Sequence, residues 1–310
     1  MIVWTKKILL SFLCTLIITL PVNATTFAVY GDSRGDDIGV NSIILTKIVN
    51  QLVKIKPAFH LFVGDLINGD NDIEIQKKQL SHWMDIMKPI LENKNIYITF
   101  GGTHDITSKE KEQLLKESVE QPLNGPEELK ELCYSFDYEN IHIICLDSSM
   151  PEKPHSLGEK QLKWLVDDLD KTNKENIFVF SHEPAFPILR HTYKALDKFP
   201  DERDKFWDIL VKYKVDAYFC GHEHLYNCRI IKGIPQIILG GAGAPVYRGA
   251  GGEFYHYAIV DVQKDGFTIS IYDENGQLRD TISRDNKMIE MINNKILENK
   301  KKKDMGVNEF

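Results

Sequence analysis

The stretch Ala217-Tyr218-Phe219-Cys220-Gly221-His222-Glu223-His224 decides how this chain folds and where its chemistry lies. Its apolar start predicts a buried strand over 217–219. The glycine lets the backbone turn sharply after the strand, and two imidazoles follow on that turn. In open α/β sheets, sites form beyond the carboxyl ends of strands. The stretch therefore predicts a functional turn at the edge of a sheet.

The same pattern occurs four more times toward the amino terminus. Four apolar runs each lead into a polar turn: Phe27–Tyr30 into Gly31-Asp32-Ser33-Arg34, Phe59–Val63 into Gly64-Asp65, Ile96–Phe100 into Gly102-Thr103-His104-Asp105, and Ile177–Phe180 into Ser181-His182-Glu183. Each turn alone is ordinary, but five of them directly after apolar strands are not. Two Asp and four His that converge at one edge supply the oxygen and nitrogen donors of a metal site.

Helical periodicity lies between the predicted strands. It predicts helices over 41–54, 76–91, 158–170 and 201–212. A hairpin is expected from Leu132–Asp137 and Ile141–Asp147, and a second one at the Asn275-Gly276 turn. Residues 106–130 are polar and contain two prolines, which predicts a surface insertion. The alternation predicts an α/β layered protein with no internal repeat and no domain linker.

Composition narrows the class of protein. The 310 residues include 38 Lys plus Arg and 45 Asp plus Glu, which gives a net charge of −7. With 43% hydrophobic and 27% charged residues, the chain is globular, and a disordered, collagen-like, coiled-coil or multispan membrane protein is excluded. Because an acidic chain repels phosphate backbones, we expect no long nucleic acid as a partner. The oligomeric state stays open.

Residues 1–24 have the layout of an export signal. Lys6 and Lys7 precede the apolar run Ile8–Leu20, Pro21 ends it, and Val22-Asn23-Ala24 supplies small residues for cleavage. The alternative is a membrane anchor, but the run is too short to span roughly 30 Å of hydrocarbon. We therefore expect an exported protein, periplasmic or secreted, without a transmembrane anchor.

Export draws attention to the four cysteines that follow the signal. Cys133 and Cys145 flank the first expected hairpin and could pair across it. The alternative is that Cys133, Cys145, Cys220 and Cys228 are buried free thiols. Both possibilities remain open at this point.

The carboxyl-terminal residues form a separate segment in this prediction. Residues 286–310 follow a main domain over 25–285 and have Met288, Ile292 and Ile296 at helical spacing before a Lys300–Lys303 run. We expect a docked helix with a frayed charged end. Contact with a membrane surface is the alternative.

The five turns, in this order, resemble those of the calcineurin-like metallophosphoesterase superfamily, which includes purple acid phosphatases and bacterial phosphodiesterases. The resemblance covers roughly residues 26–262. It implies a four-layer α/β/β/α sandwich of two mixed sheets flanked by helices. It also implies a centre for two divalent or trivalent ions (Mn, Fe or Zn), with Asp65 between them, Asp32 and His224 on one ion, and His182 and His222 on the other. His104 would lie beside the leaving group and be oriented by Asp105.

Three residues depart from the family pattern. Arg34 stands where many members have a His ligand, and its guanidinium has no lone pair for a metal but can clamp phosphate oxygens. Asn68 stands where purple acid phosphatases have a Tyr ligand, and Thr103 stands where most members have Asn. Asn68 and Thr103 are thus weaker candidate ligands. The glycine-rich segment Leu239–Gly252 is expected to turn over the site, as in related proteins.

The resemblance implies hydrolysis of phosphoric esters by a metal-bound hydroxide, with His104 as proton donor. Arg34 departs from the family pattern, and from its chemistry we expect it to neutralise charge in the transition state. We favour small phosphomonoesters, because a guanidinium suits a dianionic end group. The alternatives are a phosphodiesterase, or a module with a degenerate site that binds a phosphorylated ligand with little activity. The other histidines are expected to pack in the fold or face solvent: His60, His82, His142, His155, His191 and His256.

Overall fold

The computed structural model describes residues 24–92 and 95–285. The predicted export signal up to Asn23 and the predicted tail over 286–310 lie outside these residues. Within the described part of the chain, no helix is both long and apolar enough to cross a membrane.

The first sheet combines the beginning and the end of the described chain. Its strand order is β13-β12-β11-β1-β3-β4. The bounds are β1 (Thr25–Tyr30), β3 (Phe59–Phe62), β4 (Ile96–Ile98), β11 (His256–Gln263), β12 (Gly266–Asp273) and β13 (Leu278–Asp285). The strands β1, β3 and β4 are parallel, so their carboxyl ends meet at one edge. The remaining pairs are antiparallel, which makes the sheet mixed.

The second sheet comes from the middle of the chain, in the order β5-β6-β7-β8-β10-β9. The bounds are β5 (Tyr134–Tyr138), β6 (Ile141–Cys145), β7 (Asn176–Phe180), β8 (Ala217–Cys220), β9 (Tyr226–Ile231) and β10 (Ile234–Leu239). The four strands β6, β7, β8 and β10 are parallel, and an antiparallel strand closes each side.

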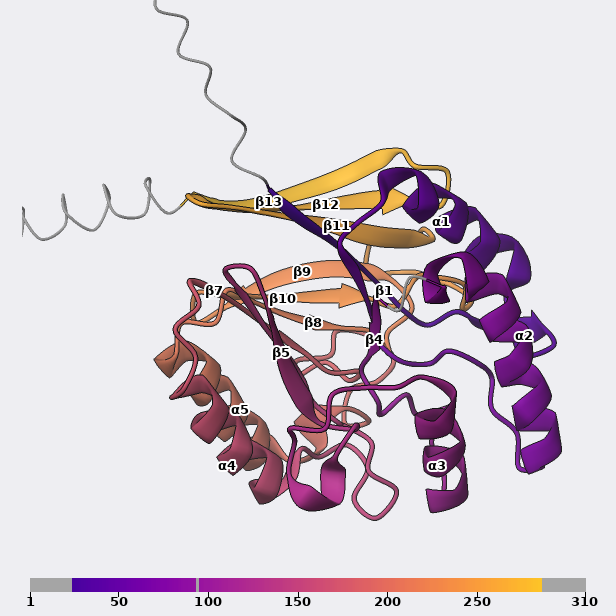
Figure 1. Ribbon diagram of the computed structural model, residues 1–310, viewed down its shortest axis with the longest axis horizontal. Helices are drawn as coiled ribbons and strands as arrows, with labels where there is room; N and C mark the ends of the chain where they lie inside the picture. Colours follow the sequence, from indigo (N-terminus) through magenta and orange to yellow (C-terminus); the bar gives the residue numbers. More distant parts are fainter. Residues whose placement is uncertain (1–23, 93–94, 286–310) are drawn as a thin grey trace, which may run out of the picture.

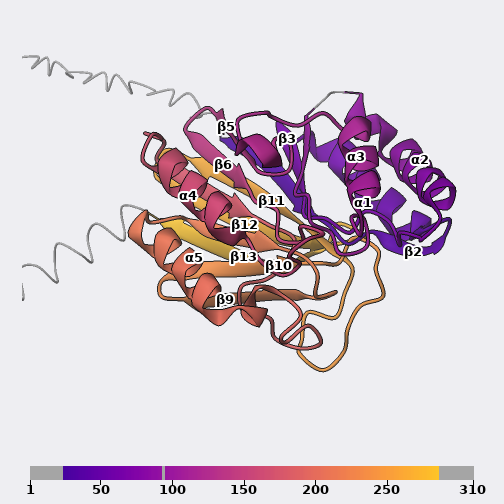
Figure 2. The same ribbon diagram turned by 90° about the horizontal axis from the view of Figure 1, so that it is seen from below.

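Helices cover the outer faces of the two sheets. The helices α1 (Ser42–Ile55), α2 (Ile73–Leu91) and α3 (Lys109–Ser118) lie on one side, and α4 (Gly158–Leu169) and α5 (Pro200–Lys212) lie on the other (Figure 1). Figure 2 shows the strands between these two groups of helices. Trp83 of α2 packs on Phe62 of β3, and Trp207 of α5 packs on Tyr218 of β8. The expected four-layer sandwich is confirmed.

Aromatic side chains form the contact between the sheets. The ring of Phe27 in β1 lies 5.5 Å from that of Phe178 in β7, and Phe59 in β3 lies 5.5 Å from Phe136 in β5. Tyr97 of β4 stacks on Phe136 at 3.8 Å. Burial of these large rings supplies much of the free energy that holds the two sheets together. The carboxyl ends of the parallel strands are thereby held next to each other.

Most predicted elements are found within a few residues, but residues 106–130 differ from the prediction. This segment contains the helix α3, whose Leu115 is buried, and a short 3₁₀ turn at Glu127–Leu129. Ser108 caps α3 by accepting a hydrogen bond from the Lys111 amide. The prediction of a surface insertion missed this helix because its apolar face is narrow.

The cysteines settle the open question of pairing. Cys133, Cys145 and Cys220 are buried free thiols, and Cys228 is a half-buried free thiol. The hairpin has the register Tyr134 opposite Cys145, so Cys133 is not the cross-strand partner of Cys145. The suggested Cys133–Cys145 disulfide is therefore wrong, and the alternative of free thiols holds.

Candidate functional site

The turns after β1 and β3 lie side by side. The Asp32 amide donates to the Gly64 carbonyl at 2.9 Å, and the Ser33 amide donates to the Asp65 carbonyl at 3.0 Å. Both aspartates have left-handed backbones, with φ of 59° and 52°, and both carboxyl groups are buried. Because β1 and β3 are parallel neighbours, the first two predicted ligands come together at the sheet edge.

Two histidines approach from the second sheet. His182 follows β7 and donates its Nδ1–H to the Val63 carbonyl at 2.8 Å, which leaves Nε2 with a lone pair. His222 follows β8 and donates its Nε2–H to the Lys194 carbonyl at 2.8 Å, which leaves Nδ1 with a lone pair. These two lone-pair nitrogens lie 3.2 Å apart. Such lone pairs repel each other unless a proton or a cation lies between them.

Asp65 completes the first donor group. Its Oδ1 lies 3.4 Å from His182 Nε2, and one donor atom from each of Asp65, His182 and His222 lies within 4.8 Å of the others. All three residues are buried. One carboxylate and two imidazoles whose other nitrogens are held by carbonyls suit Zn²⁺, Mn²⁺ or iron. The structure therefore brings together the predicted donors of one ion.

A second donor group shares Asp65. Asp32, Asp65 and His224 also have donor atoms within 4.8 Å of one another. His224 donates its Nδ1–H to the Pro245 carbonyl at 3.2 Å, and its Nε2 lies 3.7 Å from Asp32 Oδ1. The pairing of residues matches the one that the resemblance implies.

Burial and charge set the protonation of these groups. Burial raises the pKa of Asp32 to about 8. Burial also acts to raise the pKa of Asp65, but nearby imidazoles, His182 first, outweigh it and lower that pKa. Burial lowers the pKa of His222, and burial together with Arg34 lowers the pKa of His224 to about 3. Both imidazoles are thus neutral at physiological pH, which is the form that binds metals.

Gly221 allows the close approach of the Asp32 turn to the His222 turn. A Cβ at Gly221 would lie 2.1 Å from Asp32 Oδ2, so no other residue fits there. The His222 amide donates to both Asp32 carboxylate oxygens, at 3.0 and 3.1 Å. The glycine of the deciding stretch is therefore needed for the close packing of these two turns.

Arg34 points into the second donor group. Its Nη2 lies 3.5 Å from His224 Nε2, and its Nε lies 3.9 Å from Asp65 Oδ2. The Nε–H is buried and has no hydrogen-bond partner. The side chain as a whole is 22% exposed.

His104 has a different orienting partner from the one expected. Its Nδ1–H donates to the Asn68 carbonyl at 3.0 Å, and its amide donates to Asp65 Oδ1 at 3.0 Å. The Asp105 carboxylate instead accepts the amides of Leu66 and Ile67, at 3.0 and 3.1 Å. Asp105 thus fixes the turn after β3 and does not orient the imidazole, so its predicted role is corrected.

The two weaker candidate ligands lie at the edge of the site. The Asn68 side-chain amide donates to the Gly35 carbonyl at 2.5 Å, which ties the Asp65 turn to the Arg34 turn. Thr103 and Asn68 line a hollow of about 330 Å³ together with His104 and Lys111. Both residues are half-buried.

Comparison with known proteins identifies the family. The model of the family described as calcineurin-like phosphoesterase matches residues 26–226, which include all five turns of the site. The chain belongs to the calcineurin-like phosphoesterase family.

Curated relatives in this family include esterases of two kinds. A probable glycerophosphodiester phosphodiesterase, GpdQ, of Arcobacter nitrofigilis is 28% identical over 221 residues, which are 70% of each chain. Tartrate-resistant acid phosphatase type 5 of rabbit, Oryctolagus cuniculus, is 27% identical over 152 residues, which are 43% of this chain and 44% of that protein. The chain thus spans about half the length of several curated relatives that it matches.

Solved structures share the fold at low sequence identity. The purple acid phosphatase PPD1 from yellow lupin, Lupinus luteus, superposes with a TM-score of 0.65 at 14% identity, over 85% of this chain and 54% of that one. A dimetal phosphatase from Danio rerio superposes with a TM-score of 0.62 at 15% identity, over 85% and 99%. These likenesses establish the calcineurin-like phosphoesterase fold.

Two residues of this calcineurin-like phosphoesterase site were not expected from the sequence. The His191 ring lies 3.9 Å from the His222 ring, and the Tyr247 ring lies 4.5 Å from the His224 ring. Arg190 lies over Tyr247 at 4.5 Å. Burial lowers the pKa of His191 to about 4. The segment that holds His191 has no periodicity to mark it, whereas Tyr247 lies in the glycine-rich segment expected to turn over the site.

Glu223 positions the loop that carries His191. Its carboxylate accepts the Ile188 and Leu189 amides at 2.7 and 2.8 Å. This acid stands between the two imidazoles of the deciding stretch, so the same turn supplies two donors and anchors the loop beside them.

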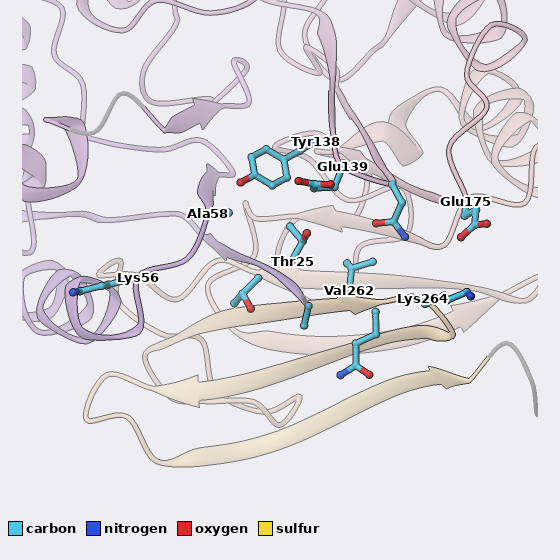
Figure 3. Close-up of a pocket in the computed structure, with 12 residues that line it drawn as sticks. Thr25, Lys56, Ala58, Tyr138, Glu139, Glu175, Val262 and Lys264 are labelled. Carbon is cyan, nitrogen blue, oxygen red and sulfur yellow. The ribbon is translucent and has the colours of Figure 1, made fainter. Parts of the chain in front are cut away.

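A separate hollow lies at the opposite end of the sheets. Figure 3 shows it between the amino-terminal end of β1, at Thr25, the end of β5, at Tyr138, and the loops that contain Ala58 and Glu175. Its volume is about 650 Å³. The predicted site residues are not among those that line it, so we assign the chemistry to the carboxyl edge.

Proposed function

We propose that the protein is a metal-dependent hydrolase of phosphoric esters and that its substrates are small phosphomonoesters. Family membership and the buried donors Asp65, His182 and His222 support the reaction class. The curated relatives include both acid phosphatases and a probable phosphodiesterase, so the choice of ester depends on this chain's own residues.

The Arg34 guanidinium is the observation that carries this choice. Its Nε–H is buried, has no hydrogen-bond partner and lies beside the donor atoms. A buried donor without a partner costs free energy, which a ligand oxygen recovers. A phosphomonoester offers a doubly charged end group with several such oxygens, whereas a diester offers a single charge.

A Mn, Fe or Zn ion held by Asp65, His182 and His222 would polarise phosphoryl oxygens and lower the pKa of a bound water. The chain's own residues supply the remaining chemistry. The Asn68 carbonyl holds His104 Nδ1–H, so Nε2 is the nitrogen left to exchange a proton with the leaving oxygen. The ring of neutral His191 packs on His222 and limits the access of water to it.

The test compares an aryl phosphomonoester with the matching aryl phosphodiester, with Mn²⁺, Zn²⁺ or iron added. We expect kcat/KM to be at least about tenfold higher for the monoester, and Arg34→Gln to lower it more for the monoester than for the diester. Faster hydrolysis of the diester would refute the proposed substrate class. Retention of the monoester preference in Arg34→Gln would refute the role of Arg34.

The second candidate function is binding of a phosphorylated ligand without turnover. Arg34 favours it, because the guanidinium lies among the atoms of the second donor group. Calorimetric titration with inorganic phosphate, together with the esterase assay, separates the two functions. Phosphate binding without hydrolysis under any of the three metals would support the binding module.

We also propose that the protein is exported. The support is the sequence of residues 1–24 alone. Amino-terminal sequencing of the protein from the periplasm or the medium is expected to begin near Thr25. Recovery of the intact amino terminus from the cytoplasm would count against export.

A further inference from the structure

We propose that the Arg34 guanidinium takes the place of the second cation, so that this chain binds one metal ion, at Asp65, His182 and His222. This inference deepens the proposed function and rests on it for the chemistry of the site. It concerns the number of ions and the residue that substitutes for one of them.

The backbone around Arg34 fixes where its side chain begins. Arg34 starts the short strand β2 (Arg34–Asp37) directly after the Asp32 turn and forms a bridge with Val40. The next carbonyl, that of Gly35, accepts the Asn68 side-chain amide at 2.5 Å. The backbone that carries the guanidinium is therefore held in place by the bridge to Val40 and the hydrogen bond from Asn68.

The guanidinium lies against the same atoms that the second ion would need. Its Nη2 is 3.5 Å from His224 Nε2, the nitrogen with the lone pair, and its Nε is 3.9 Å from Asp65 Oδ2. An ion bonded to His224 would lie about 2 Å from Nε2 and so within about 6 Å of the guanidinium. Two cations at this separation repel each other strongly, because a buried site screens their charges poorly. The geometry therefore disfavours an ion at Asp32 and His224.

The two carboxylate oxygens of Asp65 face different partners, one in the first donor group and the other in Arg34. Oδ1 faces His182 Nε2 at 3.4 Å, and Oδ2 faces Arg34 Nε. Within the described residues, no Lys or Arg nitrogen has a hydrogen bond or ion pair with the rings of His182 and His222. In this part of the chain, the two imidazoles of the first donor group are thus free of contacts with Lys and Arg side-chain nitrogens, whereas the imidazole of the second group, His224, already contacts Arg34.

The experiment counts ions and asks whether they are coupled. The purified full chain is dialysed against excess Mn²⁺ or Zn²⁺, and bound metal is measured by mass spectrometry. We expect one ion per chain, and the electron paramagnetic resonance spectrum of an isolated Mn²⁺. Arg34→His removes the charge and supplies a ligand nitrogen, so we expect two ions and an exchange-coupled spectrum.

Two further variants separate charge from ligand supply. Arg34→Gln removes the charge without adding an imidazole and should bind the second ion at least tenfold more weakly than Arg34→His. Arg190→His is the control: it makes the same substitution at the arginine that lies over Tyr247, outside both donor groups. We expect this variant to bind one ion per chain, like the wild type.

Two ions per wild-type chain with a coupled Mn²⁺ spectrum would overturn the inference, whatever the variants do. A count of one ion in a folded Arg34→His variant would also overturn it. Esterase activity is measured separately: a wild type with one ion and no turnover refutes the proposed function but leaves the inference intact.

Discussion

Backbone carbonyls orient the three imidazoles of the donor groups. His182 donates to Val63, His222 donates to Lys194, and His224 donates to Pro245. A carbonyl accepts only, so each bond fixes the tautomer and aims the lone pair of the other nitrogen at the site. The ring orientation is thus settled before any ion arrives.

His222→Ala tests this arrangement at a single residue. It removes one of three donors and leaves His182 Nε2 without its facing nitrogen. We expect metal affinity and kcat/KM to fall by at least about 100-fold, more than the loss of an outer partner costs. The control is His82→Ala. The His82 imidazole forms a 2.7 Å hydrogen bond with the Ser42 hydroxyl and belongs to neither donor group. Full activity or full metal content in His222→Ala would contradict the assignment.

Among the elements, His142 joins strand β6 to helix α4. Its Nε2 lies 2.8 Å from an Asp168 oxygen in α4, and its Nδ1 lies 2.7 Å from an Asp137 oxygen in β5. Lys174 lies 3.5 Å from the other Asp137 oxygen. Burial opposes the charge on His142, but the two carboxylates outweigh burial and raise its pKa. This packing residue therefore makes stability depend on pH.

The raised pKa sets the sign of that dependence. The folded state binds the His142 proton more tightly than the unfolded state, so the stabilisation is complete below about pH 6.5 and is lost as pH rises through the raised pKa. We expect the unfolding free energy of the wild type to fall more than that of His142→Gln between pH 6 and pH 9. Urea titrations at both pH values measure this, and parallel curves for the two proteins would contradict it.

At the scale of the whole molecule, the first donor group connects the two sheets. Asp65 follows β3 of the first sheet, whereas His182 and His222 follow β7 and β8 of the second sheet. The donors therefore come together only when the sheets pack. An ion held by them binds the native state and not the separated elements.

Metal binding should accordingly raise thermal stability. At 100 times the Kd, an ion that binds only the native state adds about 2.7 kcal/mol to the unfolding free energy. For a domain of this size, that corresponds to a rise in Tm of about 5–10 °C. Differential scanning calorimetry with Mn²⁺ and with a chelator measures the shift. The His222→Ala variant should show almost none, and an equal shift in that variant would place the ion elsewhere.

Local chemistry made the elements and the main donors predictable. Asn41 caps α1, Asn275-Gly276 turns between β12 and β13, and the apolar runs are the buried strands. Asp32 and Asp65 follow parallel neighbours in the first sheet, and His182 and His222 follow parallel neighbours in the second, so the meeting of each pair at its own sheet edge was predictable. These features depend on neighbours in the chain, and periodicity and turn propensity report on such neighbours.

Side-chain partners were decided by tertiary structure. Asp105 is next to His104 in the sequence, but in the folded protein its carboxylate accepts hydrogen bonds from the amides of Leu66 and Ile67. The sequence placed Arg34 in the first turn, but only the approach of the second sheet brought the guanidinium to His224. Hydrogen bonds and ion pairs depend on distances of a few tenths of an ångström between segments far apart in the chain. The packing of the two sheets sets those distances, and no local pattern encodes them.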